Sequence, residues 1–480
     1  MKAHDKINRR DFLRLSSLAA GSLVLGGCSG VAGQKKPNIV FIMADDLGWR
    51  DVGFMGSRFY QTPNLDRLAG EGMVFTDAYA NAPNCAPTRA CLLTGQYSPR
   101  HGVITVNSSE RGESFRRKLI PIENKLELDP DAVTIAEILG DAGYATASVG
   151  KWHLGDDPAN GPMGQGFDTN VGGYHLGHPK SYFSPYNNPA LPDGPEGEYL
   201  GDRLTDEAVE FIGANRENPF FLYLPFYNVH TPIQPKPELV ESYRARTPDG
   251  DQRNPQYAAM IEAMDSCVGR VLATLDELKL AENTIVFFFS DNGGHRRYTD
   301  NSPLHGGKGM LHEGGIREPL VVRAPGRTLA GSKCSVPVIG VDFLPTILEL
   351  AGVKQPRNLI LDGVSITSLL DGGSELSREA IYWHLPVYFE SWGYPDARDP
   401  HWRLTPSGAI RSGRWKLIEN FEDWSVELYD LESDIGETRN LAGSHPGQRD
   451  HLRSLLQQWR KDVGARVPTT RNPNYDPSRE

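Results

Sequence analysis

Four short, uninterrupted apolar runs restrict what this 480-residue chain can fold into. They lie at residues 38–43, 220–224, 284–289 and 320–322. Each run has the length of a strand and lacks the alternating polar positions of a strand with one solvated face. Such runs are typical of strands that are covered on both faces of a sheet.

Helical patterns occupy much of the chain between these runs. Apolar residues recur at helical spacing over residues 134–142, 204–214, 257–280 and 343–351, and Thr134 is a candidate N-cap. Buried strands that alternate with helices predict an α/β fold with a large, mainly parallel sheet flanked by helices. In such sheets, functional residues gather at the carboxyl ends of the strands.

The pattern changes after Gly373, where shorter segments follow. The expected elements are strands at residues 380–384, 408–411, 415–419 and 427–430 and a helix at residues 446–463. We therefore predict a C-terminal subdomain over residues 373–480, built from a small antiparallel sheet and one helix. The catalytic domain is expected to span residues 37–372.

The first residues have the pattern of an export signal. Residues 8–14 contain paired arginines and resemble a twin-arginine signal, and an apolar run at residues 15–27 follows. This run is short for a bilayer span and ends in a segment that resembles a bacterial lipobox at Cys28. We predict a signal at residues 1–27 and a lipid-anchored tether at residues 28–36. The expected location is the periplasm or the outer membrane and cell surface. An uncleaved anchor or an ordinary signal is the alternative to a lipoprotein.

Composition excludes some partners. The formal net charge of −11 argues against nucleic acid as a ligand. It also means that an anionic substrate must be attracted by a local basic pocket. Five cysteines in a chain of this length do not form a disulfide scaffold.

Polar side chains follow two of the predicted strands at the point where each strand ends. Asp45 and Asp46 come directly after the first apolar run, and Asp291 and Asn292 come directly after the third. Three carboxylates and one amide oxygen at neighbouring strand ends form a site for a hard metal ion. Taken singly, each of these pairs is more often a turn.

A reactive cysteine is predicted in the segment at residues 84–95. Pro87 is favoured in the first turn of a helix, which places Cys85 at the helix N-terminus, beside unpaired backbone N–H groups. Arg89 returns to the same face one turn later. The alternative is a buried cysteine on an ordinary amphipathic helix.

This Cys-x-Pro-x-Arg pattern resembles the signature of the type I sulfatases, which belong to the alkaline phosphatase-like superfamily. Other segments resemble further motifs of that family and its C-terminal subdomain. These segments are residues 150–155, 229–232, 305–309, 313–319, 411–418 and 427–431. The resemblance covers the chain from about residue 37 to its end, so the chain is expected to be a bacterial lipoprotein form of such a sulfatase.

The resemblance implies a modified cysteine and a metal ion. In that family the cysteine is oxidised after translation to formylglycine, an aldehyde that acts as its hydrate. A formylglycine-generating or sulfatase-maturating enzyme is therefore an expected partner of Cys85. One Ca²⁺ is expected, with Asp45, Asp46, Asp291, Asn292 and an oxygen of the modified Cys85 as its ligands. Mg²⁺ is the alternative, but flexible oxygen-rich coordination favours calcium.

The resemblance also assigns catalytic roles. Arg89, Lys151 and Lys308 are expected to neutralise the sulfate oxygens. His230, aided by Lys308, would protonate the leaving oxygen, and His153 would remove the proton of the second hydroxyl of the hydrate at Cys85. The expected activity is the release of sulfate from a sulfated carbohydrate by a sulfuric ester hydrolase.

Two other functions remain open at this point. One is a phosphonate or phosphate ester hydrolase of the same superfamily. The other is a non-catalytic, calcium-dependent glycan-binding lipoprotein in which Cys85 is not converted.

Basic and aromatic residues near these motifs are candidates for contact with the sugar. Near the catalytic loops they are His175, His178, His295, Arg296, Arg297 and His305. In a loop-like insertion of the C-terminal part they are Trp392, Tyr394, Arg398, His401 and Arg403. For each of them, a plain surface-loop position is an equal alternative.

Overall fold

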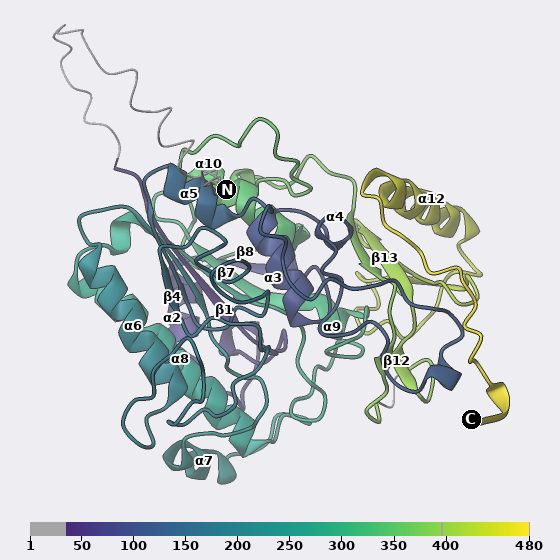
Figure 1. Ribbon diagram of the computed structural model, residues 1–480, viewed down its shortest axis with the longest axis horizontal. Coiled ribbons are helices and arrows are strands. Elements are labelled where there is room, and N and C mark those ends of the chain that lie inside the picture. The colour runs from purple at the N-terminus through teal and green to yellow at the C-terminus, as the bar shows by residue number, and fades with distance from the viewer. Residues whose placement is uncertain (1–34, 395–396, 480) are drawn as a thin grey trace, which may run out of the picture. The chain divides into compact units, whose positions relative to one another are not determined.

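The structure is a computed structural model that describes residues 35–394 and 397–479. The predicted signal, Cys28 and all but the last two residues of the predicted tether lie outside the described residues. Residues 36–480 form one compact unit, shown as the coloured ribbon in Figure 1. Among the described helices, none has the length and apolar composition of a membrane span.

A large mixed sheet runs through this unit (Figure 1). Its strands are β1 (Asn38–Ala44), β2 (Met73–Tyr79), β3 (Ala145–Val149), β4 (Thr169–Val171), β5 (Phe220–Pro225), β6 (Thr284–Ser290), β7 (Arg317–Arg323), β8 (Ser332–Cys334) and β9 (Val338–Ile339). They lie in the order β4-β3-β5-β1-β6-β7-β2-β8, and β9 pairs with β2. β7 is antiparallel to both of its neighbours, whereas every other pair is parallel. The predicted mainly parallel sheet is therefore confirmed.

Helices cover both faces of this sheet, as predicted. The α-helices are α2 (Pro63–Glu71), α3 (Cys85–Thr94), α4 (Ser98–His101), α5 (Ile135–Asp141), α6 (Leu200–Ala214), α7 (Pro237–Arg244), α8 (Pro255–Glu277), α9 (Glu313–Ile316), α10 (Phe343–Leu350), α11 (Thr367–Leu370) and α12 (Pro446–Asp462). Short 3-10 helices are η1 (Gly53–Met55), η2 (Ser114–Arg116), η3 (Ala281–Asn283), η4 (Gly340–Asp342) and η5 (Pro477–Arg479). Figure 1 shows α6 and α8 on one side of the sheet and α3, α5 and α10 on the other.

Successive strand residues enter two different hydrophobic layers, because side chains alternate along a strand. Phe41 and Phe287 pack in the layer that contains α3, α5 and α10, and Phe343 of α10 contacts both rings. Ile42 and Phe288 belong to the opposite layer, with α2, α6 and α8. Burial on both sides explains why these strands carry uninterrupted apolar runs.

Local capping sets the helix boundaries. Thr134 and Glu137 form the two hydrogen bonds of a capping box at the start of α5, which confirms the predicted cap. Asn254 caps α8, and Pro255 occupies its first turn, so this helix begins two residues before the expected position. α6 begins at Leu200, four residues earlier than its apolar spacing indicates.

A second, smaller sheet lies in the C-terminal part. Its elements are β10 (Ile381–Leu385), β13 (Ser407–Ser412), β14 (Trp415–Asn420) and β15 (Val426–Asp430), with a separate pair of β11 (Phe389–Glu390) and β12 (Trp402–Leu404). All of these pairs are antiparallel, and α12 packs on β13 and β14. This confirms the predicted small antiparallel sheet with one helix. The boundary between residues 372 and 373 stays a prediction.

A buried ionic cluster joins the two sheets. Lys416 Nζ of β14 lies 2.8 Å from Glu313 Oε1 and 2.8 Å from Glu437 Oε1. Arg317 Nε lies 2.6 Å from Glu313 Oε2. The side chains of Lys416, Glu313 and Glu437 are fully shielded from solvent, so each depends on its partners for charge compensation.

We expect Lys416→Met to lower the free energy of unfolding by about 3–5 kcal/mol, because removal of one member of a buried ion pair leaves its partner uncompensated. Denaturant titration followed by tryptophan fluorescence measures this change. Lys461→Met, at an exposed position in the last turn of α12, is the matched control and should leave the titration midpoint unchanged. Equal midpoints for the two variants would contradict the assigned role of Lys416.

Candidate active site

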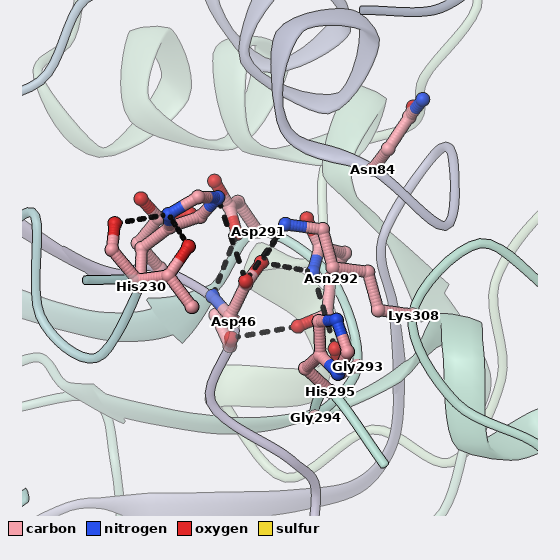
Figure 2. A network of polar contacts seen from close by, with 12 residues as sticks. Asp46, Asn84, His230, Asp291, Asn292, Gly293, Gly294, His295 and Lys308 are labelled. Atoms are coloured by element: carbon pink, nitrogen blue, oxygen red, sulfur yellow. Dashed lines mark hydrogen bonds and ion pairs between the residues drawn. The ribbon is translucent and has the colours of Figure 1, made fainter. Parts of the chain in front are cut away.

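The ends of β1 and β6 bring the predicted carboxylates together. These strands are parallel neighbours, with Ala44 of β1 paired to Ser290 of β6. Asp45, Asp46 and Asp291 therefore leave the sheet at the same edge, and one carboxylate oxygen of each lies within 4.8 Å of the others. Figure 2 shows Asp46 between His230 on one side and Asn292 and Lys308 on the other.

Three buried cations compensate these three carboxylates. Arg89 Nη2 lies 2.6 Å from Asp291 Oδ2, and Lys151 Nζ lies 2.6 Å from Asp45 Oδ2. Lys308 Nζ lies 2.6 Å from Asp46 Oδ1. Because buried carboxylates are costly without a partner, each cation is needed where it stands.

Charge compensation is uneven within the carboxylate cluster. Burial alone would raise the pKa of Asp46, but the charge of Lys308 holds it below its ordinary value. The pKa of Asp45 is raised by burial and by the carboxylate of Asp291. A further positive charge among these groups would relieve that repulsion.

Cys85 occupies the start of α3, as predicted. Asn84 precedes the helix in an extended conformation, and Pro87 lies in the first turn. The sulfur of Cys85 lies within 4.8 Å of a carboxylate oxygen of Asp45 and a ring nitrogen of His230. Burial raises the pKa of this thiol, against the opposing effect of Lys151 and Lys308.

His230 has one ring nitrogen fixed and the other directed at the site. Its Nδ1 lies 2.8 Å from the carbonyl oxygen of Thr231, so a proton on Nδ1 is donated to that oxygen. Its Nε2 lies 3.6 Å from Asp46 Oδ2. Burial and the charge of Lys308 hold the pKa of His230 well below its ordinary value. The imidazole is therefore neutral in this state.

His153 lies at the same edge of the sheet. Its backbone φ of 67° lies in the left-handed region, which turns the chain after β3. Among the described residues, its Nδ1 is buried without a hydrogen-bond partner. Burial, followed by the charges of Lys151 and Arg89, holds the pKa of His153 well below its ordinary value. A neutral ring with an open nitrogen is suited to accept a proton.

The family models decide which family this constellation belongs to. A model described as Sulfatase matches residues 37–353, and one described as N-sulphoglucosamine sulphohydrolase, C-terminal, matches residues 305–462. The chain belongs to the sulfatase family. It therefore has the alkaline phosphatase-like fold of that family and is a sulfuric ester hydrolase.

Similar proteins align with nearly the whole length of this sulfatase. It is 35% identical over 500 residues to a sulfatase of Formosa agariphila, an alignment that covers 89% of each chain. It is 33% identical to the N-acetylgalactosamine-6-sulfatase of Canis lupus familiaris, with 93% of this chain and 84% of that one covered. The crystal structure of Ps i-CgsB in complex with k-i-k-neocarrahexaose is 31% identical, with a TM-score of 0.76, over 91% of this chain and 96% of the other.

The predicted sugar-contact residues lie in different surroundings. His295 stacks on Trp392 with ring centroids 5.2 Å apart, and the backbone N–H of Arg296 donates to the Tyr394 hydroxyl. His178 stacks on His230 at 6.2 Å, next to the reaction centre. The contacts of His295 and Arg296 bring the catalytic loops next to the C-terminal insertion that contains Trp392 and Tyr394.

Other candidates make contacts away from the carboxylates. His305 stacks on His312 at 4.2 Å, and Arg398 Nη2 lies 2.5 Å from Asp423 Oδ2. His175 Nδ1 lies 2.7 Å from Asp156 Oδ2, and Arg297 is exposed. His401 lines a cavity of about 430 Å³ together with Trp392 and Trp402. The roles of these residues stay predictions.

Sequence reasoning missed a glycine that supports His153. A Cβ atom added to Gly177 would lie 2.2 Å from Cε1 and 2.5 Å from Nδ1 of the His153 ring. The imidazole therefore rests directly on the backbone at Gly177. No motif marks this glycine, because the contact arises only when the loop after β4 folds back.

We expect Gly177→Ala to lower kcat for sulfate release by about 10- to 100-fold, because displacing a reacting group by about 1 Å has an effect of this order. Initial rates and thermal melting of the purified variant measure the effect. Gly213→Ala is the matched control, since Gly213 lies in α6 with no neighbouring atom near the added Cβ. An unchanged kcat for Gly177→Ala would contradict this positioning of His153.

Proposed function

We propose that this sulfatase releases sulfate from a sulfated carbohydrate, and that Cys85 is converted to formylglycine for this purpose. One observation carries the proposal: the Cys85 sulfur stands at a helix N-terminus beside Asp45 and His230, with the charges of Lys151 and Lys308 acting on it. The N-acetylgalactosamine-6-sulfatase relative is named for a sulfated sugar, which supports the substrate class.

We propose Ca²⁺ as the metal of this site. Asp45 Oδ1 and Asn292 Oδ1 are buried with no hydrogen-bond partner among the described residues. Both oxygens are therefore free to coordinate a metal ion. Together with Asp46 and Asp291 they form a set of oxygen donors, and flexible oxygen-rich sets favour calcium. The bound ion would neutralise the carboxylates and polarise a sulfate oxygen.

The chain's own residues divide the remaining work. Lys151, Lys308 and Arg89 supply positive charge around the position of the sulfate group, where charge develops in the transition state. His230 Nε2, which lies 3.6 Å from Asp46 Oδ2, would protonate the leaving oxygen, since a bound anion favours the charged imidazole. The formylglycine hydrate would supply one hydroxyl that attacks sulfur as the S–O bond to the sugar breaks. Deprotonation of its second hydroxyl would then expel sulfate and regenerate the aldehyde. His153 would accept that second proton, which is supported by its buried Nδ1 having no hydrogen-bond partner among the described residues.

We further propose that the protein is an exported lipoprotein. The paired arginines at residues 8–14 and the lipobox-like segment before Cys28 support this proposal. Twin-arginine export carries folded proteins, so a formylglycine-generating or sulfatase-maturating enzyme would convert Cys85 in the cytoplasm. The resulting enzyme would act in the periplasm or at the outer membrane.

Sulfate release from sulfated oligosaccharides tests the proposed function. We expect enzyme that is co-produced with a maturation enzyme to release sulfate over many turnovers. We expect Cys85→Ser to lose that turnover, because serine has no second hydroxyl whose deprotonation could expel the bound sulfate. Ion chromatography of sulfate measures both. Sustained turnover by Cys85→Ser would contradict the mechanism. Faster cleavage of matched phosphate or phosphonate esters would support the rival hydrolase.

We expect Ca²⁺ to stabilise the fold, by about 2.7 kcal/mol when the free ion is at 100 times its Kd. Thermal melting in Ca²⁺ and in EDTA measures the difference. Asn292→Ala should reduce it, because this variant removes an oxygen donor that has no hydrogen-bond partner in the described part of the chain. Asn218→Ala, at an exposed position, serves as the control. Identical melting curves with and without Ca²⁺ would contradict the metal assignment.

A further inference from the structure

A buried guanidinium group beside the active site forms no salt bridge with any carboxylate of the described residues. Arg403 is 4% exposed, and its Nε and Nη1 have no hydrogen-bond acceptor among the described residues. Aromatic rings surround it instead: its Cζ lies 3.6 Å from the centroid of Trp392, 5.3 Å from that of Phe389 and 5.5 Å from that of Tyr394. Burying a cation in this way costs free energy that the rings only partly offset.

Backbone contacts place Arg403 close to the reaction centre. A Cβ atom added to Gly309 would lie 2.2 Å from Arg403 Nε, so the guanidinium packs against the backbone next to Lys308. The N–H of Gly309 donates to the carbonyl of Pro83 at 2.8 Å, two residues before Cys85. Arg403 therefore stands in contact with the loop that carries one of the proposed sulfate-binding lysines.

A second guanidinium shares the ring of Phe389. Arg111 Cζ lies 4.9 Å from its centroid, and Arg111 donates hydrogen bonds to the backbone carbonyls of Val106 and Ser108. Neither Arg111 nor Arg403 has a carboxylate within salt-bridge distance among the described residues. The acidic group that acts on both is Glu390, whose Oε1 accepts the N–H of Gly112 at 3.2 Å. Two cations thus face one acidic group at this edge of the site.

Burial is the main influence on the pKa of both guanidinium groups. It lowers the pKa of Arg403 to about 10 and also lowers the pKa of Arg111. Both side chains remain charged at neutral pH. A bound anion is the kind of partner that would remove this penalty.

An aromatic surface continues from the pair toward solvent. Trp392 is 50% exposed, and its indole stacks on His295 and on Arg403. The cavity of about 430 Å³ beside it is lined by Trp402 and His401 as well. Exposed aromatic faces next to polar groups are typical of binding sites for sugar rings.

We propose that Arg403 and Arg111 bind a second anionic group of the substrate, a carboxylate or a further sulfate ester, while the sulfate to be removed sits at Cys85. Trp392 packs against the sugar that carries this group. The proposal rests on the proposed function, because it takes the carbohydrate sulfate at Cys85 as its reference point. It narrows the substrate class to glycans with at least two negative charges near one another.

Binding in a Cys85→Ala background separates this proposal from the hydrolysis mechanism. Calorimetry would compare N-acetylgalactosamine 6-sulfate and glucosamine 6-sulfate with their disulfated forms and with disaccharides that join each to glucuronate. We expect the doubly charged probes of at least one sugar to bind about 10- to 100-fold more tightly, the effect of a charge-assisted bidentate contact. The disulfated and glucuronate probes distinguish a second sulfate from a carboxylate.

Substitutions of single arginines test which residue causes the preference for doubly charged probes. Arg403→Met should reduce the affinity ratio between doubly and singly charged probes to about threefold or less, and Arg111→Gln should reduce it partly. Arg414→Met removes a guanidinium that already pairs with Asp430 and Glu432, and should keep the wild-type ratio. If Arg403 had only a structural role, Arg403→Met would weaken the binding of singly and doubly charged probes equally.

Three results would overturn the proposal: equal binding of both probe classes, an unchanged ratio in Arg403→Met, or no binding of any probe. If the ratio behaves as expected but converted enzyme releases no sulfate, the proposed function fails while the second anion site stands. If sulfate is released without any preference for the second charge, the anion site fails while the proposed function stands.

Discussion

The compensation of three buried carboxylates by three buried cations is the interaction on which the site depends. Asp45, Asp46 and Asp291 are at most 2% exposed, and an unpaired charge at this depth strongly destabilises the fold. Their partners come from α3, from the loop after β3 and from the glycine-rich segment before α9. Because each partner comes from a different element, the strand order of the large sheet and the chemistry of the site are fixed together.

The same arrangement explains the buried start of α3. Arg89 donates to Asp291 and also to the carbonyl oxygen of Lys151, so the helix is tied to two strand ends at once. Cys85 is held one turn earlier on the same helix, where the positive charges of Lys151 and Lys308 act on it. The proposed chemistry uses groups that the fold already requires for its own stability. The proposed Ca²⁺ would add the positive charge that a bound sulfate needs beyond these three pairs.

Much of this site was predictable from the sequence, and the features that were not predictable have physical reasons. Asp45 and Asp291 follow apolar runs, and parallel neighbouring strands place such ends at one edge. The antiparallel direction of β7 was not predicted, because apolar periodicity carries no information on strand direction. Gly177 and Arg111 belong to no motif, and their contacts depend on loops that return from distant parts of the chain. Arg403 was a candidate, but that it pairs with no carboxylate of the described residues is visible only once its neighbours are placed.

The central claim concerns the chemical identity of residue 85 in the working enzyme. The most direct test is mass spectrometry of the peptide that contains Cys85, from protein whose sulfate release has been measured in the same preparation. The account predicts an aldehyde or its hydrate at position 85, in a fraction that rises in proportion to specific activity across preparations with different degrees of maturation. A fully active preparation in which residue 85 is a free thiol would contradict it.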